Sequence, residues 1–145
     1  MEFRSMRRKR QQLSEEKSIG ILQKSTAGTL ALLGDGGYPY AVPISYVYAE
    51  GKMYFHSALS GHKVDAIRNC NKASFCVIDK DDVQPAKYTT FFRSVIAFGR
   101  IHIIEDEQEK HMGCKVVDTV GIWYHHQIVL CDVVTMLIKH KTALA

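Results

Sequence analysis

The chain has 145 residues, of which 46% are hydrophobic and 23% are charged, and its formal net charge is +4. This composition is typical of one globular domain that is long enough to bury a core, and it excludes an intrinsically disordered chain. No apolar segment approaches the roughly 20 residues that cross a bilayer, and no apolar stretch follows the basic start. We therefore expect a cytoplasmic protein with no membrane partner.

The first ten residues carry five Lys or Arg side chains and form a basic arm. Clustered positive charge can hold nucleic acid through its phosphates. No aromatic residue lies between these charges, so a solvated arm is favoured and nucleic acid is not an expected partner. A partner subunit or the phosphate of a cofactor could also use the charges. We therefore divide the chain into an arm at residues 1–12 and one domain at residues 13–145.

The first predicted element is a helix that begins at Ser14 and ends near Lys24. Ser14 can cap the first turn, and the two Glu residues that follow it suit the positive end of a helix. A strand is expected at residues 27–33, which are mostly apolar or β-branched. The glycine-rich segment at residues 34–37 supplies the positive φ angles of a hairpin turn.

Two more strands and a second helix are predicted next. Residues 38–48 (YPYAVPISYVY) alternate along a strand, in which Pro43 cannot donate a ladder hydrogen bond and so marks an edge or a bulge. Residues 52–57 form the following strand, and a helix is expected at residues 62–69.

The remaining predicted elements are longer. A strand at residues 73–79 precedes a loop at residues 81–87, and a long strand then covers residues 89–104 with a bend at Gly99. An acidic segment begins a helix, and residues 128–138 can form the closing strand. Strands joined by tight turns, with few short helices, indicate a mainly β protein built as an antiparallel barrel.

The segment between the strand at residues 52–57 and the helix at residues 62–69 gathers polar side chains at a helix N-terminus. Ser60 is the predicted N-cap, Ser57 adds a hydroxyl group, and Lys63 adds a positive charge in the first turn. A helix N-terminus favours an anion, so a cation there is unfavourable unless an anion is bound. Two interpretations stay open on these residues alone: a phosphate site, and a capped surface helix with a solvated lysine.

A second polar patch interrupts the long apolar strand at Arg93 and Ser94. An arginine in mid-strand lowers stability unless it is paired, and its guanidinium group suits a phosphate. An edge arginine on a solvated face is the alternative. The chain contains neither a G-x-G-x-x-G nor a G-x-x-x-x-G-K-[ST] loop, so Rossmann and P-loop sites are not supported.

The cysteines and the paired histidines do not indicate a metal site. None of the four cysteines belongs to a C-x-x-C pair, so we interpret them as small buried hydrophobic residues. His125 and His126 would point to opposite faces of a strand, and no carboxylate or cysteine is spaced to complete a ligand set. We therefore expect no metal.

Four segments of the sequence resemble a known family: YPYAVPISYVY, HSALSGHKVDAIR, ASFCVI and FRSVIAFGR. They are similar to the FMN-binding split-barrel flavoproteins related to pyridoxamine 5′-phosphate oxidase, and within them to the 5-nitroimidazole-resistance (Nim-type) branch. The resemblance covers roughly residues 3–109. It implies a homodimer of six-stranded antiparallel split β-barrels with a few short flanking helices, and two FMN molecules at the subunit interface.

The resemblance also implies which residues contact FMN. The positions expected to line the isoalloxazine ring are Val42, Pro43, Ile44 and Ser45. The positions expected to contact the ribityl phosphate or to flank it are Ser57, His62, Lys63, Arg93 and Ser94. His56 matches a histidine close to the flavin and the substrate, and it is the candidate catalytic residue. A strand histidine bonded to a backbone carbonyl is the alternative for this position.

The activity that the resemblance implies is an FMN-dependent oxidoreductase that reduces a small acceptor, such as a nitroimidazole-like nitroaromatic compound, with electrons from NAD(P)H. His56 could supply a proton to the reduced substrate. After about Lys110 the sequence departs from the family pattern, so the resemblance does not indicate which residues form the substrate side of the pocket. Two alternatives are a non-catalytic flavin- or cofactor-binding protein that acts as sensor or carrier, and a nucleic-acid- or partner-binding module that uses the basic arm.

A homodimer is also indicated by the residues themselves, because the chain has more large aromatic side chains than one small core readily buries, and aromatic residues are enriched at interfaces. These residues are Tyr40, Tyr46, Tyr48, Phe91, Phe92 and Trp123.

Overall fold

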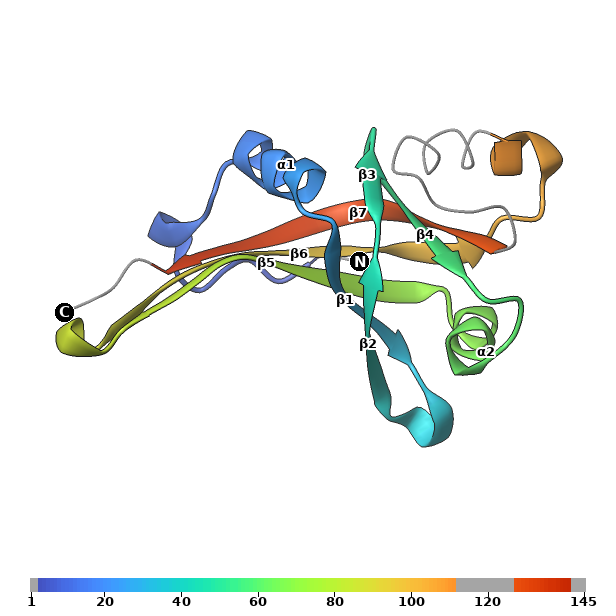
Figure 1. The fold of residues 1–145 in the computed structure, drawn as a ribbon, viewed down its shortest axis with the longest axis horizontal. Helices are drawn as coiled ribbons and strands as arrows, with labels where there is room; N and C mark the ends of the chain where they lie inside the picture. Colours follow the sequence, from blue (N-terminus) through green and yellow to red (C-terminus); the bar gives the residue numbers. More distant parts are fainter. Residues whose placement is uncertain (1–2, 112–126, 142–145) are drawn as a thin grey trace.

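The computed structural model describes residues 3–111 and the backbone of residues 127–141 (Figure 1). The strands in these ranges are β1 (Ala27–Leu33), β2 (Pro39–Ser45), β3 (Val47–Ala49), β4 (Lys52–Ser57), β5 (Lys72–Gln84), β6 (Thr89–Ile103) and β7 (Gln127–Lys141). The helices are α1 (Glu15–Lys24) and α2 (His62–Asn69), with short 3-10 helices η1 (Lys9–Gln11), η2 (Asp35–Gly37) and η3 (Pro85–Lys87). The acidic segment does begin a helix, at Glu107. Trp123, His125 and His126 lie outside the described residues.

The strands form a barrel that closes through one bent strand. Their order is β2-β1-β5-β6-β7-β4-β3, and all neighbours are antiparallel. The two ends of this order, β2 and β3, are consecutive in the chain and are separated only by Tyr46. They are therefore two halves of one strand, which pairs first with β1 and then with β4. The prediction of a six-stranded antiparallel split barrel is confirmed.

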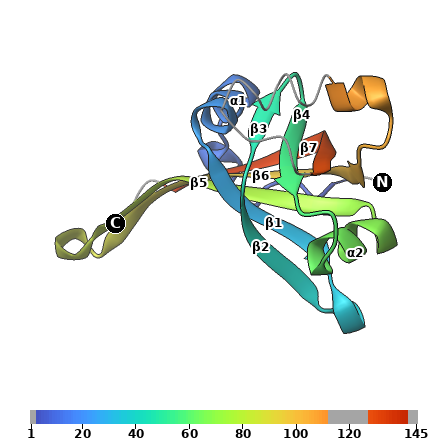
Figure 2. The same cartoon turned by 45° about the vertical axis from the view of Figure 1, so that its right-hand side comes forward.

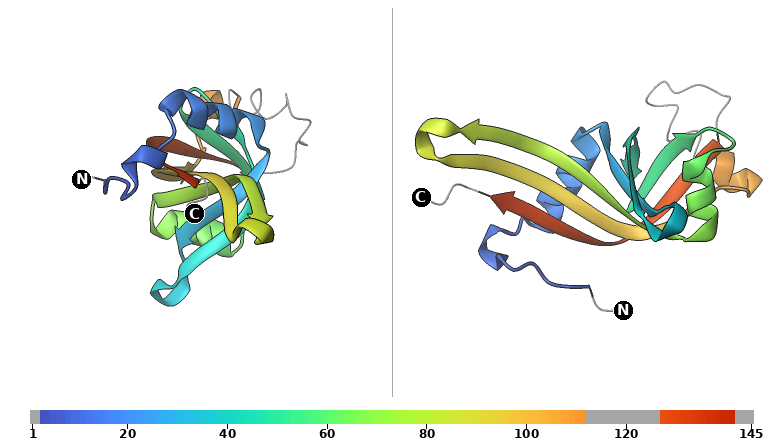
Figure 3. Two further views of the ribbon diagram at one scale, coloured as in Figure 1. Left: turned by 90° about the vertical axis from the view of Figure 1, so that its left-hand side faces the viewer. Right: turned by 90° about the horizontal axis from the view of Figure 1, so that it is seen from below.

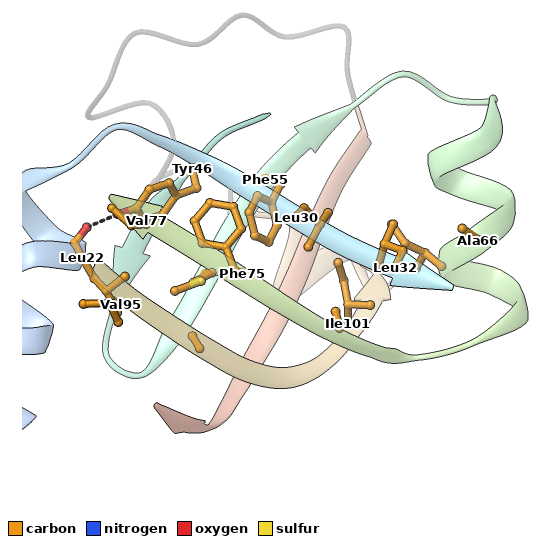
Figure 4. Close-up of a cluster of buried hydrophobic side chains, with 14 of the residues drawn as sticks. Leu22, Leu30, Leu32, Tyr46, Phe55, Ala66, Phe75, Val77, Val95 and Ile101 are labelled. Carbon is orange, nitrogen blue, oxygen red and sulfur yellow. Dashed lines mark hydrogen bonds between the residues drawn. The ribbon is translucent and has the colours of Figure 1, made fainter. Parts of the chain in front are cut away.

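Tyr46 fixes the corner at which the bent strand changes partners. Its backbone N–H donates to the carbonyl oxygen of Thr26 at 3.0 Å. Its hydroxyl group donates to the carbonyl oxygen of Leu22 in α1 at 2.7 Å (Figure 4). Burial raises the pKa of Tyr46 to about 12, and a hydrogen bond with Ser25 offsets this only in part. The corner thus holds α1 against the barrel.

The core fills the barrel with aromatic and branched side chains (Figure 4). The ring of Phe75 lies 4.8 Å from that of Tyr46 and 5.2 Å from that of Phe55, between ring centroids. A Cβ atom at Gly28 would lie 2.6 Å from the Cys76 carbonyl oxygen and 2.6 Å from the Phe75 ring. Only glycine therefore allows β1 to lie this close to β5.

The hairpin of β5 and β6 extends well beyond the barrel (Figure 3). The prediction of a loop at residues 81–87 is wrong, because β5 continues to Gln84 and only η3 forms the turn. Asp81 and Asp82 disfavour strands by propensity, but ladder pairing with Phe92 and Phe91 of β6 overrides it. The predicted bend is confirmed by a register shift between Phe98 and Gly99.

The two helices lie at opposite ends of the barrel (Figure 2). The prediction that α1 begins after Ser14 is confirmed, since the Ser14 Oγ atom accepts a hydrogen bond from the Lys17 backbone N–H at 3.2 Å. Helix α2 packs on β1 and β6. Among the described residues, no helix has the length and apolar character that crossing a membrane requires.

Candidate functional site

The polar segment highlighted by the sequence joins β4 to α2, and we call residues 56–63 the β4–α2 junction. Strand β4 ends at Ser57, and α2 begins at His62. The prediction of Ser60 as N-cap is wrong: the cap position is Gly61, with φ at 129°, a backbone angle that favours glycine. No side chain caps α2, so its first backbone N–H groups lack the partner that a cap residue supplies.

Two side chains of the junction are buried in ways that disfavour their polar groups. The Ser57 side chain is 3% exposed, and its hydroxyl oxygen has no hydrogen-bond partner among the described residues. Lys63, one residue into α2, is partly buried, and this burial lowers the pKa of its amino group. A bound anion would supply what both groups lack, an acceptor for the hydroxyl proton and a counter-charge for the amine.

His62 has contacts that the sequence did not predict. Its ring stacks on Tyr40 of β2 with 4.0 Å between ring centroids and 23° between ring planes. Its Nε2 atom accepts a hydrogen bond from the Asp35 backbone N–H at 3.4 Å and lies 3.7 Å from the Asp35 carboxylate. These contacts join the β1–β2 turn to the start of α2. A contact between His62 and a phosphate stays a prediction.

Strand β2 presents its predicted positions on two faces. Val42 and Ile44 are partly buried and pack against the core. Pro43 and Ser45 alternate with them and are exposed. Pro43 has no N–H group, so β2 lacks a backbone donor at that position. The exposed side chains of Pro43 and Ser45 are available to the planar ring of a ligand.

His56 lies on β4, near the point at which the bent strand formed by β2 and β3 stops pairing with β4. Strands β3 and β4 pair with Val47 opposite Tyr54, and continuing this register places Ser45 opposite His56. β2 leaves the ladder at this level to pair with β1, although it stays in contact with β4. The structure therefore places the end of β4, which carries His56 and Ser57, beside β2; because these two residues are consecutive in a strand, their side chains point to opposite faces of β4.

Arg93 and Ser94 lie elsewhere in the chain. In β6, Arg93 is ten residues from Ile103, which is roughly 33 Å along a strand. Ile103 lies across β7 from the end of β4, close to the level of His56. Within one chain, Arg93 and Ser94 therefore do not lie beside the β4–α2 junction. Their contact with a cofactor stays a prediction.

Arg93 instead pairs with Asp79 of β5, a partner that the sequence analysis did not identify. The Arg93 Nε atom donates to one carboxylate oxygen, and the Lys24 amino group of α1 donates to the other at 3.2 Å. The Asp79 side chain is only 3% exposed. Burial alone raises the pKa of Asp79, but the hydrogen bonds and charges of Lys24 and Arg93 outweigh it and lower the pKa below its ordinary value. Asp79 is therefore ionised at neutral pH.

The described groups fit a ligand with a phosphate and a planar ring. The hydroxyl of Ser57, the amino group of Lys63 and the uncapped N-terminus of α2 suit the phosphate. The exposed face of β2 is available to the ring, and His56 lies on the neighbouring strand β4. A flavin cofactor combines such a ring with a phosphate.

Comparisons with known proteins agree with this fold. The family model for pyridoxamine 5′-phosphate oxidase matches residues 14–121. A candidate 5-nitroimidazole antibiotic resistance protein from Bacteroides thetaiotaomicron superposes with a TM-score of 0.76 at 18% identity, over 88% of this chain and 84% of that one. An FAD and heme binding protein from Mycobacterium smegmatis gives a TM-score of 0.74 at 19% identity, over 92% and 74%. An FAD-binding protein from Mesorhizobium loti gives 0.69 at 20% identity, over 90% and 96%.

No curated protein is similar enough in sequence to count as a relative. At 18–20% identity, the structural matches support the fold alone. The family match is broader, because it covers most of the chain and contains β2, the β4–α2 junction and β6. The chain belongs to the pyridoxamine 5′-phosphate oxidase family.

Proposed function

We propose that this protein is an FMN-dependent oxidoreductase that takes electrons from NAD(P)H and reduces a small nitroaromatic or related acceptor. Membership of the family supports flavin chemistry. Two of the structural neighbours are described as FAD-binding or as FAD and heme binding, and a third as a candidate nitroimidazole resistance protein. When bound, the flavin would supply the redox chemistry by accepting hydride and passing electrons to the acceptor.

The observation that carries this proposal is the unsatisfied hydroxyl of Ser57. A buried hydroxyl without a partner costs free energy, so such a group calls for an explanation. The Ser57 hydroxyl lies four residues before the cap position of α2, which no side chain caps, and burial lowers the pKa of Lys63 in the first turn of this helix. A phosphate would satisfy all three features at once, and a neutral ligand would satisfy fewer.

The protein's own residues have separate roles in this proposal. Ser57, Lys63 and the start of α2 hold the phosphate, and the outer face of β2 holds the ring. His56, near the end of β4, holds or delivers a proton to the reduced acceptor, a role that histidine side chains commonly have in enzymes. His62 fixes the start of α2 through Tyr40 and Asp35.

The same proposal includes a homodimer with the flavin at its interface. Arg93 and the β4–α2 junction are roughly 33 Å apart along β6, so they can serve one flavin only from two subunits. The projecting β5–β6 hairpin is available for such an exchange, and its residues Val83 and Tyr88 are 62% and 97% exposed. Exposed apolar side chains on an extended hairpin favour contact with a second copy.

The first experiment tests the phosphate site. We expect purified protein to show the visible absorbance bands of a flavin, and chromatography of the released cofactor to identify FMN rather than FAD. Lys63→Gln should weaken FMN binding by at least about tenfold, because it removes a charged hydrogen bond. Lys72→Gln, at the exposed first residue of β5, is the matched control and should leave binding unchanged. A colourless protein that does not take up added FMN would overturn the proposal.

A second experiment tests the shared site by mixing variants. Ser57→Ala and Arg93→Gln subunits each damage both sites of their own homodimers. A mixed dimer has one intact site if each site uses Ser57 of one subunit and Arg93 of the other. Random mixing should therefore restore about a quarter of the flavin sites. No recovery in verified mixed dimers would contradict the shared site while leaving the phosphate site of each chain in place.

Turnover distinguishes the proposed enzyme from a flavin-binding sensor or carrier. The second function is favoured by the descriptions of the structural neighbours from M. smegmatis and M. loti, which state binding and no reaction. Flavin-loaded protein should oxidise NAD(P)H when a nitroimidazole is added, and His56→Ala should slow this reaction without releasing the flavin. Bound flavin with no NAD(P)H oxidation would favour the carrier, and full activity in His56→Ala would remove the proton role.

A further inference from the structure

A second basic site lies between α1, η1 and the β5–β6 strands, far from the β4–α2 junction. It is a cavity of about 530 Å³, here called the α1 cavity. Four basic side chains line it: Arg10, Lys17, Lys24 and Arg93. Among the described residues, the lining contains one carboxylate, that of Asp79. Four positive charges and one negative charge leave an excess of three positive charges around one concave space.

Asp79 positions two of these basic groups. Its buried carboxylate accepts hydrogen bonds from Lys24 and Arg93, which approach it from α1 and β6. A single carboxylate balances only one of the two charges, and both side chains keep partial access to solvent. The pair is therefore held at fixed positions on the cavity wall while half of its charge stays uncompensated.

The other two basic groups, those of Arg10 and Lys17, have no carboxylate partner among the described residues. Among the residues that the structure describes, Arg10 and Lys17 make no ion pair. Glu15 and Glu16 lie on the same helix as Lys17, but neither lines the cavity. Like charges that share a cavity disfavour one another, and an anion between them reverses the sign of that interaction.

The size and the chemistry of the lining indicate the class of ligand. A volume of about 530 Å³ is within the range of small-molecule sites and exceeds what a lone inorganic anion needs. Leu13 and Ile21 add apolar surface for an organic part. Arginine side chains bind phosphate through paired hydrogen bonds. None of the described lining residues is aromatic, so stacked bases of a nucleic acid strand are disfavoured.

We propose that the α1 cavity binds a phosphorylated small molecule, such as a nucleotide, at a site separate from the proposed flavin. Arg10 and Lys17 contact its phosphates, Lys24 adds a charge that Asp79 positions, and Leu13 and Ile21 contact the organic part. This inference does not depend on the proposed oxidoreductase activity, because Arg10 and Lys17, which carry it, have no role in the proposed flavin site; Arg93 is the one residue that both proposals share.

The test uses purified protein with whatever flavin it retains, and titration calorimetry with pyrophosphate, AMP and adenosine. We expect pyrophosphate and AMP to bind, and adenosine, which lacks the phosphate, to bind at least tenfold more weakly. The double variant Arg10→Gln with Lys17→Gln should weaken pyrophosphate and AMP binding by at least about tenfold. Its flavin absorbance should equal that of the wild-type protein.

The matched control is the double variant Arg7→Gln with Arg8→Gln, which removes the same charge from exposed arm residues outside the cavity. It should change AMP binding by less than twofold. Equal weakening in both double variants would overturn the proposal, because AMP binding would then depend on the overall positive charge of this region and not on the residues of the cavity. Three other results would also overturn it: no binding of pyrophosphate or AMP, loss of flavin in the cavity variant, and binding of a single-stranded oligonucleotide without binding of AMP.

Discussion

Two polar regions of this barrel differ in whether their buried polar groups have hydrogen-bond partners. Around Asp79, a buried carboxylate accepts hydrogen bonds from two basic side chains, and its pKa is lowered. At the β4–α2 junction, the buried hydroxyl of Ser57 has no partner among the described residues, and the pKa of Lys63 is lowered by burial alone. The Asp79 carboxylate thus has its partners within the chain, whereas the Ser57 hydroxyl has none among the described residues.

This difference separates stability from binding. A satisfied buried group contributes to folding, so its removal lowers the free energy of unfolding. An unsatisfied buried group costs folding free energy, and a ligand that binds only the folded state repays that cost when it is present. Substitutions around Asp79 should therefore change stability, and substitutions at the β4–α2 junction should change ligand affinity.

The largest expected effect is on stability at Asp79. Asp79→Asn removes the charge that holds Lys24 and Arg93, and it leaves a buried amide against two cations. We expect a loss of about 3 kcal/mol in the free energy of unfolding, measured by urea denaturation. Asp81→Asn, two residues along the same strand and exposed, should cost less than about 0.5 kcal/mol. Equal losses in both variants would remove the contrast.

The next effect is an alkaline loss of stability at Tyr46. The pKa of Tyr46 is raised from 10.0 to about 12 in the fold, so the folded state retains the phenol proton more strongly than the unfolded chain. The contribution of this difference to the free energy of unfolding is complete below pH 10.0 and is lost as the pH rises towards about 12. Near the upper value the loss should be about 2 kcal/mol. Tyr46→Phe should lack this part of the pH dependence in urea denaturation, whereas Tyr88→Phe, at an exposed residue, should keep it.

Local signals explain which parts of this fold were predictable from the sequence. Helix α1 has its cap at Ser14, and the change from strand to helix at the β4–α2 junction depends on residues that are close in sequence. Propensity failed at Asp81 and Asp82, where pairing with β6 extends β5 beyond the predicted loop. It also failed at the α2 cap, because Gly61 takes a backbone angle that serine rarely adopts.

Contacts between distant residues were not predictable in the same way. The Arg93–Asp79 pair lies at a register shift in β5 between Ile78 and Lys80, which no local pattern indicates. The only available signal for this pair was that Asp79 and Arg93 lie at similar sequence distances before and after the turn of the hairpin. The stack of His62 on Tyr40 depends on how α2 meets β2 in space. Sequence analysis therefore assigned residues to strands and helices better than it identified the contacts between distant side chains.

A smaller effect is expected at His62, which tests whether this side chain serves the fold or the ligand. His62→Ala removes the stack on Tyr40 and the acceptor for the Asp35 N–H. We expect a loss of about 1 kcal/mol in stability, with FMN affinity reduced less than in Lys63→Gln. Arg68→Ala, an exposed position of the same helix, is the control. Unchanged stability with abolished FMN binding would instead make His62 a direct phosphate ligand.

The smallest expected effect on stability is at Ser57, and it is the most informative. In flavin-free protein, Ser57→Ala removes a buried hydroxyl that has no described partner, so the free energy of unfolding should change by less than about 0.5 kcal/mol. The same variant should bind FMN at least about tenfold more weakly, measured by titration of absorbance. Ser60→Ala, at an exposed position of the same loop, should change neither quantity.

These two measurements on Ser57→Ala separate the possible roles of the hydroxyl. A large loss of stability without flavin would mean that the hydroxyl is satisfied inside the protein, and the junction would then resemble the region around Asp79. Unchanged stability with unchanged FMN affinity would mean that the flavin phosphate does not contact Ser57. Only the combination of unchanged stability and weakened binding assigns the hydroxyl to a ligand, because folding alone then gains nothing from it.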